Sequence, residues 1–150
     1  MKAKDIMTES PACCTPASSL REAAALMCEN DCGEIPVVNN KESMRPVGVI
    51  TDRDIACRSV ALGKNALELT VEDCMTQPCV TVPRDINIED CCKVLEENKI
   101  RRVPVVDEDG KCCGIVAQAD IAQHASKIET ATVVKGVSQP KETASRVTAG

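Results

Sequence analysis

The pattern of hydrophobic and polar residues predicts short helices and short strands in alternation. Two segments, 20–30 and 88–98, carry apolar side chains every three or four positions, which is the period of an amphipathic helix. Each segment is preceded by a capping residue, Ser19 or Asn87, with an acidic residue three positions later. Both segments are therefore predicted to be helices with one buried face.

Short apolar runs surround these two helices and predict strands, and a further helix is predicted to start at Thr51 and at Ala117. The strands are expected at 12–15, 35–38 and 46–50 in the first half of the chain, and at 80–82, 103–106 and 112–116 in the second half. Each half thus reads as strand, helix, strand, strand, helix.

The two halves are copies of one unit. DIMT (5–8) matches DCMT (73–76) at an offset of 68 residues, and GVITDRDI (48–55) matches GIVAQADI (114–121) at an offset of 66. A unit of this size can hardly bury its own sheet, so the two units are expected to pack face to face. The predicted fold class is therefore α/β (α+β), built from two β-α-β-β-α repeats.

Composition excludes several classes of function. The net charge is −5 and no cluster of Lys or Arg exceeds a pair, so binding to a nucleic-acid backbone is not expected. The absence of Phe, Tyr and Trp excludes stacking platforms for bases. No apolar run approaches the roughly 20 residues of a membrane helix, and the N-terminus has no apolar signal core. The sequence predicts a cytoplasmic protein without membrane contact.

Eleven cysteines stand out, but their spacing does not predict a metal site. Their number is odd, there is no CxxC spacing, and His124 is the single histidine. Most of them occupy positions that are hydrophobic in the other repeat, so they are predicted to fill the core. Cys28 and Cys32 lie four residues apart near a helix end and are the candidate pair for oxidation.

The sequence does not predict an enzyme. No Ser/His/Asp set is present, the seven glycines form no phosphate-binding loop, and no carboxylate cluster has metal-ligand spacing.

The chain resembles a tandem pair of cystathionine-β-synthase (CBS) domains, the unit called a Bateman module. The motifs that carry the resemblance are DIMT/DCMT, the helix after each, IPVV/VPVVD and GVITDRD. It implies two units related by a pseudo-twofold axis, at 3–62 and 71–125, joined by a linker at 63–70. Residues 126–150 are expected to form a helical extension and a loose tail. The module is expected to stand alone.

The resemblance also implies a function. Many members bind adenosine-containing ligands such as AMP, ATP or S-adenosylmethionine in the clefts between the two units, and they commonly form dimers. AMP, ADP, ATP or S-adenosylmethionine is therefore the expected regulatory ligand, with no required cofactor. The expected partners are a second copy of the chain and an unknown downstream protein.

Thr51 and Asp54 are the first candidates for ligand contacts. A helix start offers free N–H groups to a phosphate, and the Thr51 hydroxyl adds a hydrogen bond. An ionised Asp54 only accepts hydrogen bonds and suits the two hydroxyls of a ribose. The same two residues also read as a capping box that needs no ligand, and both interpretations stay open.

Arg101 and Arg102 are the second candidates. They are either solvated arginines at a strand end or, as the resemblance implies, donors to a phosphate in the Thr51/Asp54 cleft. By the same family analogy, further residues line the base and the ribose of this cleft: Cys14, Ser19, Cys32, Gly33 and Glu34.

The second cleft is predicted to be the weaker one. Ala117 replaces the threonine, and by symmetry Glu34 faces this cleft, where a carboxylate repels phosphate. Its candidate residues are Asp120, Val82 and Ile100. The predicted function is a regulatory module that senses an adenosine-containing nucleotide and signals to a partner. The alternatives are a non-binding interaction or scaffold module and a thiol-based redox sensor.

Overall fold

A computed structural model describes residues 1–124. The helices are α1 (Ala3–Ile6), α2 (Leu20–Glu29), α3 (Asp52–Arg58), α4 (Val71–Cys74), α5 (Ile88–Asn98) and α6 (Gln118–His124), with short 3₁₀ helices η1 (Val60–Leu62) and η2 (Ala66–Glu68). The strands are β1 (Thr8–Glu9), β2 (Glu34–Val38), β3 (Pro46–Thr51), β4 (Val82–Pro83), β5 (Arg102–Val106) and β6 (Cys112–Ala117). The expected tail at 126–150 lies outside the described residues.

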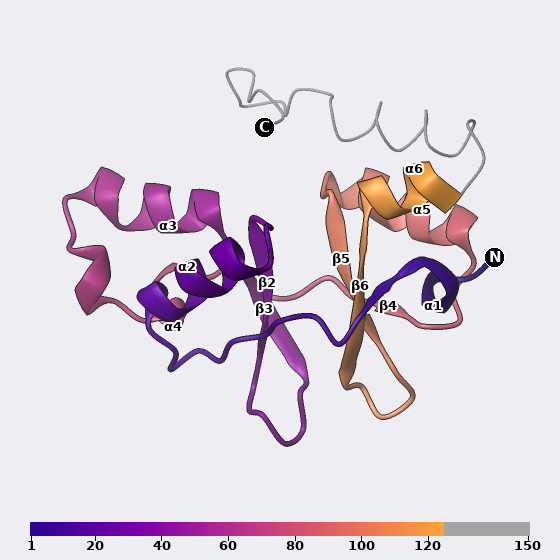
Figure 1. Ribbon diagram of the computed structural model, residues 1–150, viewed down its shortest axis with the longest axis horizontal. Helices are drawn as coiled ribbons and strands as arrows, with labels where there is room; N and C mark the ends of the chain where they lie inside the picture. Colours follow the sequence, from indigo (N-terminus) through magenta and orange to yellow (C-terminus); the bar gives the residue numbers. More distant parts are fainter. Residues whose placement is uncertain (125–150) are drawn as a thin grey trace.

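Two similar α/β units stand next to each other, with the β2–β3 and β5–β6 hairpins at the centre and both hairpin loops at the lower edge (Figure 1). Both hairpins are antiparallel and have the same register, with Val37 opposite Gly48 and Val105 opposite Gly114. Both carry an irregularity at the same place, one residue further along β2 and β5. The mixed α/β fold of two repeats is therefore confirmed.

The two long helices form where the sequence pattern predicts them. The Ser19 hydroxyl accepts a hydrogen bond from the backbone N–H of Glu22 (3.1 Å), and the Asn87 side chain accepts one from that of Asp90 (2.9 Å). Each cap satisfies a donor that the first helical turn leaves unpaired. The buried residues of α2 and α5 are Leu20, Ala23, Met27, Ile88, Cys91, Cys92 and Leu95.

Each unit is completed by a segment that precedes the other repeat in sequence. Strand β1 pairs with β6, with Thr8 opposite Ile115, and α1 packs into the core of the second unit. In the same way Thr76 pairs with Val49 of β3, and α4 packs into the core of the first unit. Figure 1 shows the chain crossing from α1, beside the second unit, to α2 in the first. The packing units thus exchange their leading segments.

This exchange explains the glycine that both repeats share. A Cβ atom on Gly48 would lie 2.5 Å from the backbone oxygen of Thr76. A Cβ atom on Gly114 would collide with Met7 and lie 3.1 Å from the backbone oxygen of Thr8. The crossing segment lies directly against the strand in both units, so only glycine fits.

The core is divided between the two units, as the repeat requires. Four of the cysteines predicted to fill it, Cys14, Cys74, Cys91 and Cys92, are buried there. A smaller buried cluster contains Cys13, Val38 and Cys112. Cysteine therefore acts here mainly as a small hydrophobic side chain.

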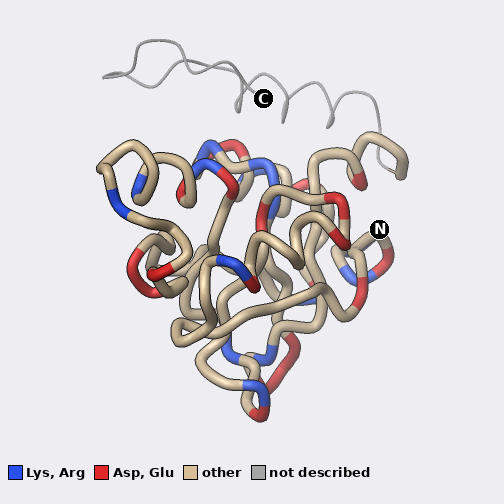
Figure 2. Tube along the Cα trace, turned by 60° about the vertical axis from the view of Figure 1, so that its left-hand side comes forward, with Lys and Arg blue, Asp and Glu red and all other residues tan. Residues whose placement is uncertain are grey.

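The described surface carries charges of both signs. Figure 2 shows Lys and Arg positions interspersed with Asp and Glu positions, including at the hairpin loops, and not gathered into one stripe. Within residues 1–124, no helix is long and apolar enough to cross a membrane.

Candidate functional site

A pocket of about 600 Å³ lies between α2, the start of α3 and the first residue of β5. Three of the predicted site residues, Cys32, Gly33 and Arg102, line it together. Arg102 belongs to the second repeat and the other two to the first, so the pocket spans both units. The remaining lining residues are Ala24, Met27, Cys28, Asp31, Asp52 and Ile55.

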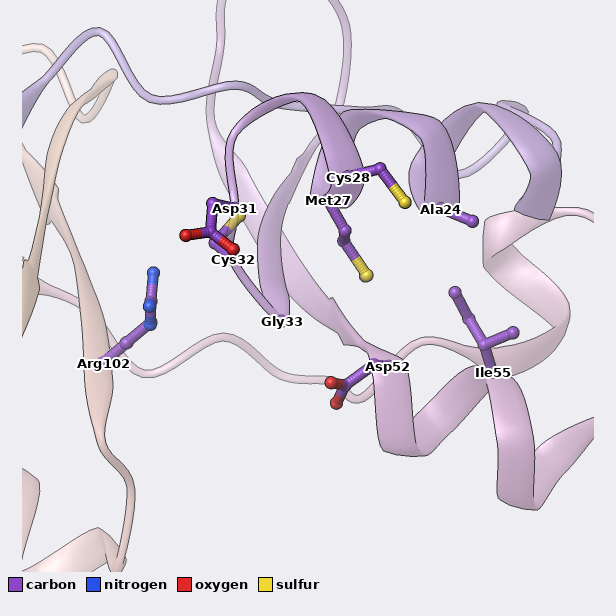
Figure 3. A pocket seen from close by; sticks show the side chains of 9 residues that line it. All are labelled: Ala24, Met27, Cys28, Asp31, Cys32, Gly33, Asp52, Ile55 and Arg102. Atoms are coloured by element: carbon purple, nitrogen blue, oxygen red, sulfur yellow. The ribbon is translucent and has the colours of Figure 1, made fainter. Parts of the chain in front are cut away.

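The pocket has a charged side and an apolar side. In Figure 3, the Arg102 side chain extends from β5 toward the part of the pocket where Asp31 lies, and the Asp52 carboxylate lies across from it. Met27 and Ile55 lie deeper between α2 and α3 in the same view. A small molecule with one apolar ring and one polar or charged end matches this division.

Gly33 lies directly against Asp52 at the edge of the pocket. A Cβ atom on Gly33 would lie 2.8 Å from the Asp52 carboxylate. The backbone N–H of Asp52 also donates to the Gly33 carbonyl oxygen at 2.9 Å. The turn before β2 and the start of α3 are therefore held in direct contact at the base of the pocket.

Thr51 and Asp54 form the capping box that their spacing predicts. The Thr51 hydroxyl accepts a hydrogen bond from the backbone N–H of Asp54 (3.0 Å), and the Asp54 carboxylate accepts one from the backbone N–H of Thr51 (3.1 Å). The Thr76 hydroxyl donates to the same carboxylate at 3.1 Å, and the Arg58 guanidinium lies 3.8 Å from it. Asp54 is 9% exposed. Its carboxylate is thus held by protein groups before any ligand enters.

Glu34, at the start of β2, is the least satisfied polar residue near the pocket. Its Oε2 atom is buried and has no hydrogen-bond partner within residues 1–124. Burial raises the pKa of Glu34 to about 7, the positive charge of Arg102 opposes this, and the negative charge of Asp54 adds to it. Arg102 and Asp54 are both candidate residues of the first cleft. The charges of that cleft therefore act on the Glu34 carboxyl.

The other predicted residues of the first cleft have structural roles. Cys14 lies in the first core, where it pairs with Val37 of β2, and burial raises the pKa of its thiol to about 11. The Ser19 side chain is the cap of α2. The backbone oxygen of Arg101 accepts a hydrogen bond from the N–H of Gln118 at 2.8 Å. The lining residues given above include none of these three, and they do not include Thr51, Asp54 or Glu34 either.

The residues predicted for the second cleft are mostly core residues. Val82 is buried, and Ile100 packs against the same cluster. The Asp120 carboxylate accepts a hydrogen bond from the backbone N–H of Ala117 at 2.8 Å. Asp120 therefore keeps one half of the capping box that Asp54 completes in the first repeat.

Sequence reasoning missed the hydrogen bond of Thr76 to Asp54 and six of the lining residues, Ala24, Met27, Cys28, Asp31, Asp52 and Ile55. The signal for Thr76 was present, because the threonine of DIMT is repeated in DCMT. Its proximity to Asp54 depends on the crossing of the segment before the second repeat, which no local pattern shows. Within residues 1–124, no group of three or more His, Cys, Asp or Glu side chains could hold a metal ion.

Known proteins match the chain along most of its length. It is 38% identical over 120 residues to the uncharacterised protein MK0525 of Methanopyrus kandleri, covering 80% of this chain and 58% of that protein. It is 32% identical over 143 residues to hypoxic response protein 1 of Mycobacterium tuberculosis, covering 95% and 98%. The chain thus spans less than two thirds of the first relative and nearly all of the second.

Solved structures match the fold. The crystal structure of hypoxic response protein I with two coordinated zinc ions has a TM-score of 0.76 and 33% identity, covering 84% of this chain and all of that one (100%). CBSX2, from Arabidopsis thaliana, in complex with AMP gives a TM-score of 0.68 and 30% identity, covering 81% and 93%.

The CBS domain pair of protein MJ0100, in complex with 5′-methylthioadenosine and S-adenosyl-L-methionine, gives a TM-score of 0.70 and 31% identity, covering 82% of this chain and 94% of that one. The family model of the CBS domain matches residues 3–60 and 71–127. The chain therefore belongs to the CBS domain family and carries two copies of its repeat.

Proposed function

We propose that this protein is a regulatory module that binds an adenosine-containing ligand in the first cleft and signals to a partner protein as a homodimer. The observation that carries the proposal is the pocket shared by the two repeats, in which Arg102 of the second faces Gly33 and Asp52 of the first. The AMP complex of CBSX2 and the S-adenosylmethionine complex of MJ0100 support the choice of ligand class.

Each part of such a ligand has a matching group. The apolar side of the pocket accepts the base, and the Arg102 guanidinium matches the geometry of a phosphate. The ribose hydroxyls are donors for Asp54, which already accepts a hydrogen bond from Thr76. A ribose therefore competes with Thr76, which lies on the segment that leads into the second repeat. In this way occupancy of the cleft is transmitted to the contact between the two units.

The charged residues of the pocket should distinguish phosphate ligands from S-adenosylmethionine. Arg102 favours an anionic phosphate, whereas Asp31 and Asp52 favour the positive sulfonium of S-adenosylmethionine. Because the pKa of Glu34 is about 7, its carboxyl is largely neutral at pH 6 and largely ionised at pH 8. We therefore expect ATP to bind more tightly at pH 6 and S-adenosylmethionine to bind more tightly at pH 8.

The test is isothermal titration calorimetry of the full chain with AMP, ADP, ATP and S-adenosylmethionine at both pH values. We expect Arg102→Gln to weaken binding of a phosphate ligand about 10- to 100-fold, because a charge-assisted hydrogen bond is lost. Asp120→Asn is the matched control in the second cleft and should leave binding unchanged. If Asp120→Asn were the damaging change, the assignment of the clefts would be wrong.

A non-binding scaffold module is the second candidate. It is favoured by one observation, namely that Thr51 and Asp54 are already satisfied by their capping box and by Thr76. If no ligand of the panel releases heat or raises the melting temperature of the wild type, the scaffold function replaces the sensor function.

A further inference from the structure

The carboxylate of Asp54 is covered by a threonine from the segment that leads into the second repeat. The Thr76 hydroxyl lies 3.1 Å from Oδ1 and 3.2 Å from Oδ2, so one hydroxyl spans both oxygens. Asp54 does not line the pocket, although Asp52 and Ile55 of the same helix do. The two neighbouring hydroxyls of a ribose need the same two oxygens, so they can bind only after the Thr76 hydroxyl has left.

Arg58 holds the segment that carries Thr76. It is the last residue of α3, and its guanidinium donates to the carbonyl oxygens of Cys74 (3.3 Å) and Met75 (2.8 Å). Both carbonyls lie at the end of α4, where a helix leaves such groups unpaired, and an arginine is a suitable donor there. Pro78, four positions after Cys74, has no N–H that could take its place. Arg58 thus fixes the two residues before Thr76 against α3.

The backbone of Thr76 is fixed as well. Its N–H donates to the Val49 carbonyl oxygen at 2.8 Å, and its own carbonyl oxygen accepts from the Val49 N–H at 2.9 Å. The direct ion pair between Arg58 and Asp54 is long, at 3.8 Å, and half of the Arg58 side chain is exposed, so this pair alone adds little. The contact with Asp54 therefore depends on where the segment holds the Thr76 hydroxyl.

The second repeat lacks this cover over its carboxylate. Strand β1 carries Thr8, the counterpart of Thr76, along β6. Within residues 1–124, the Asp120 carboxylate accepts a hydrogen bond from the backbone N–H of Ala117 and none from Thr8. His124 stands at the end of α6, where α3 has an arginine. The cover is therefore particular to the first cleft and does not follow from the fold of the repeat.

We propose that Thr76 and Arg58 form an autoinhibitory latch, which occupies Asp54 in the ligand-free protein and which the ribose hydroxyls of a nucleoside displace. Thr76 is the competing group, and Arg58 is the positioning residue that keeps it in place. The latch rests on the function proposed above, because it closes the same cleft. Removing either side chain should strengthen nucleoside binding, whereas the loss of a merely structural contact would weaken it.

The test is calorimetric titration of the full chain with adenosine, which has the ribose hydroxyls but no charge. This probe reports the contact with Asp54 without the attraction of a phosphate to arginine. We expect Thr76→Val to bind adenosine about 3- to 10-fold more tightly than the wild type, because a hydrogen bond to a carboxylate no longer has to be broken. Thr76→Ser keeps the hydroxyl and should bind as the wild type does.

A double variant tests the role of Arg58. Arg58→Gln should strengthen adenosine binding about 2- to 5-fold in the wild type and not at all in Thr76→Val, because its effect passes through Thr76. A gain that persists in the double variant would assign the effect to the charge of Arg58 on Asp54 and would overturn its positioning role. Thr8→Val and His124→Gln are the matched controls in the second repeat and should leave binding unchanged, with circular dichroism confirming that each variant is folded.

The outcomes separate the latch from the sensor function. If the wild type binds AMP, but Thr76→Val and Arg58→Gln bind adenosine no more tightly than the wild type does, the latch is refuted and the sensor function stands. If adenosine binds measurably only to these two variants, the latch is confirmed. If neither the wild type nor the variants bind AMP or adenosine, both are refuted.

Discussion

At the scale of single residues, Glu34 is a carboxyl group whose pKa burial raises to about 7. The charges of Arg102 and Asp54 both act on its carboxyl, and within residues 1–124 its buried Oε2 atom has no hydrogen-bond partner. A buried carboxyl without hydrogen bonds favours its neutral form. Glu34 therefore couples the protonation state of the protein to its stability.

The stability of the wild type should fall with pH because of Glu34. Its pKa rises from 4.5 in the unfolded chain to about 7 in the fold, so its stabilising contribution is complete below about pH 4.5 and is lost as the pH rises through 7. In Glu34→Gln this dependence disappears, and between pH 5 and pH 8 the variant should gain about 2–3 kcal/mol relative to the wild type. Urea unfolding at both pH values measures the difference.

The exposed residue Glu42 supplies the control for this measurement. Glu42→Gln should follow the wild type at both pH values. A Glu34→Gln variant with the pH dependence of the wild type would contradict the assigned pKa.

At the scale of elements, the helices α3 and α6 begin with one complete cap and one half cap. In α3, Thr51 and Asp54 satisfy each other's backbone N–H groups. In α6, Asp120 accepts from the N–H of Ala117, and alanine offers nothing in return. The change from threonine to alanine in the second copy therefore removes one hydrogen bond and leaves the fold of the repeat unchanged.

Single substitutions at these two cap positions should change the free energy of unfolding in opposite directions. Thr51→Ala should lower the free energy of unfolding by about 1 kcal/mol, whereas Ala117→Thr should raise it by about 0.5–1 kcal/mol, because it adds the missing acceptor. Thr51→Ser keeps the hydroxyl and should change little. Chemical denaturation of the three variants provides the test, and a destabilised Ala117→Thr would speak against the cap in α6.

At the scale of the whole molecule, the exchange of leading segments joins the two repeats. Helix α1 lies in the second core and α4 in the first, so neither half of the sequence contains all of its own core. Strand β1 pairs with the edge of β6, and Thr76 makes a single bridge to Val49 of β3. The two units are thus expected to fold as one cooperative system.

Separated halves should therefore fail to fold. Fragments 1–64 and 65–150 each lack the segment that completes their core, and a unit of about 60 residues is marginal even when complete. We expect each fragment alone to give weak circular dichroism without cooperative unfolding, and an equimolar mixture to recover the signal of the intact chain. A monomeric fragment that unfolds cooperatively by itself would refute this expectation.

The two long helices and the two hairpins were predictable from the sequence because they depend on local periodicity. The strand expected at 12–15 was wrong, because that segment makes only a single bridge, from Cys14 to Val37. The faces of α2 and α5, the caps Ser19 and Asn87, and the start of α3 after Thr51 all follow from residues within one or two turns of one another. The hydrogen bond of Asp54 with Thr76 and the effect of the Arg102 charge on Glu34 were not predictable from local periodicity, because the partners are 22 and 68 residues apart.

The sequence by itself determined that the chain contains two repeats and in which order their elements follow. It also determined that the cap at Thr51 is complete and the cap at Ala117 is not, because repetition and capping are properties of short segments. Only the tertiary structure decided which unit each leading segment completes, which predicted residues line one pocket, and which cysteines of the two repeats share one buried cluster. These depend on how sheet edges and apolar faces from distant parts of the chain cover one another, and many pairings satisfy the same local pattern.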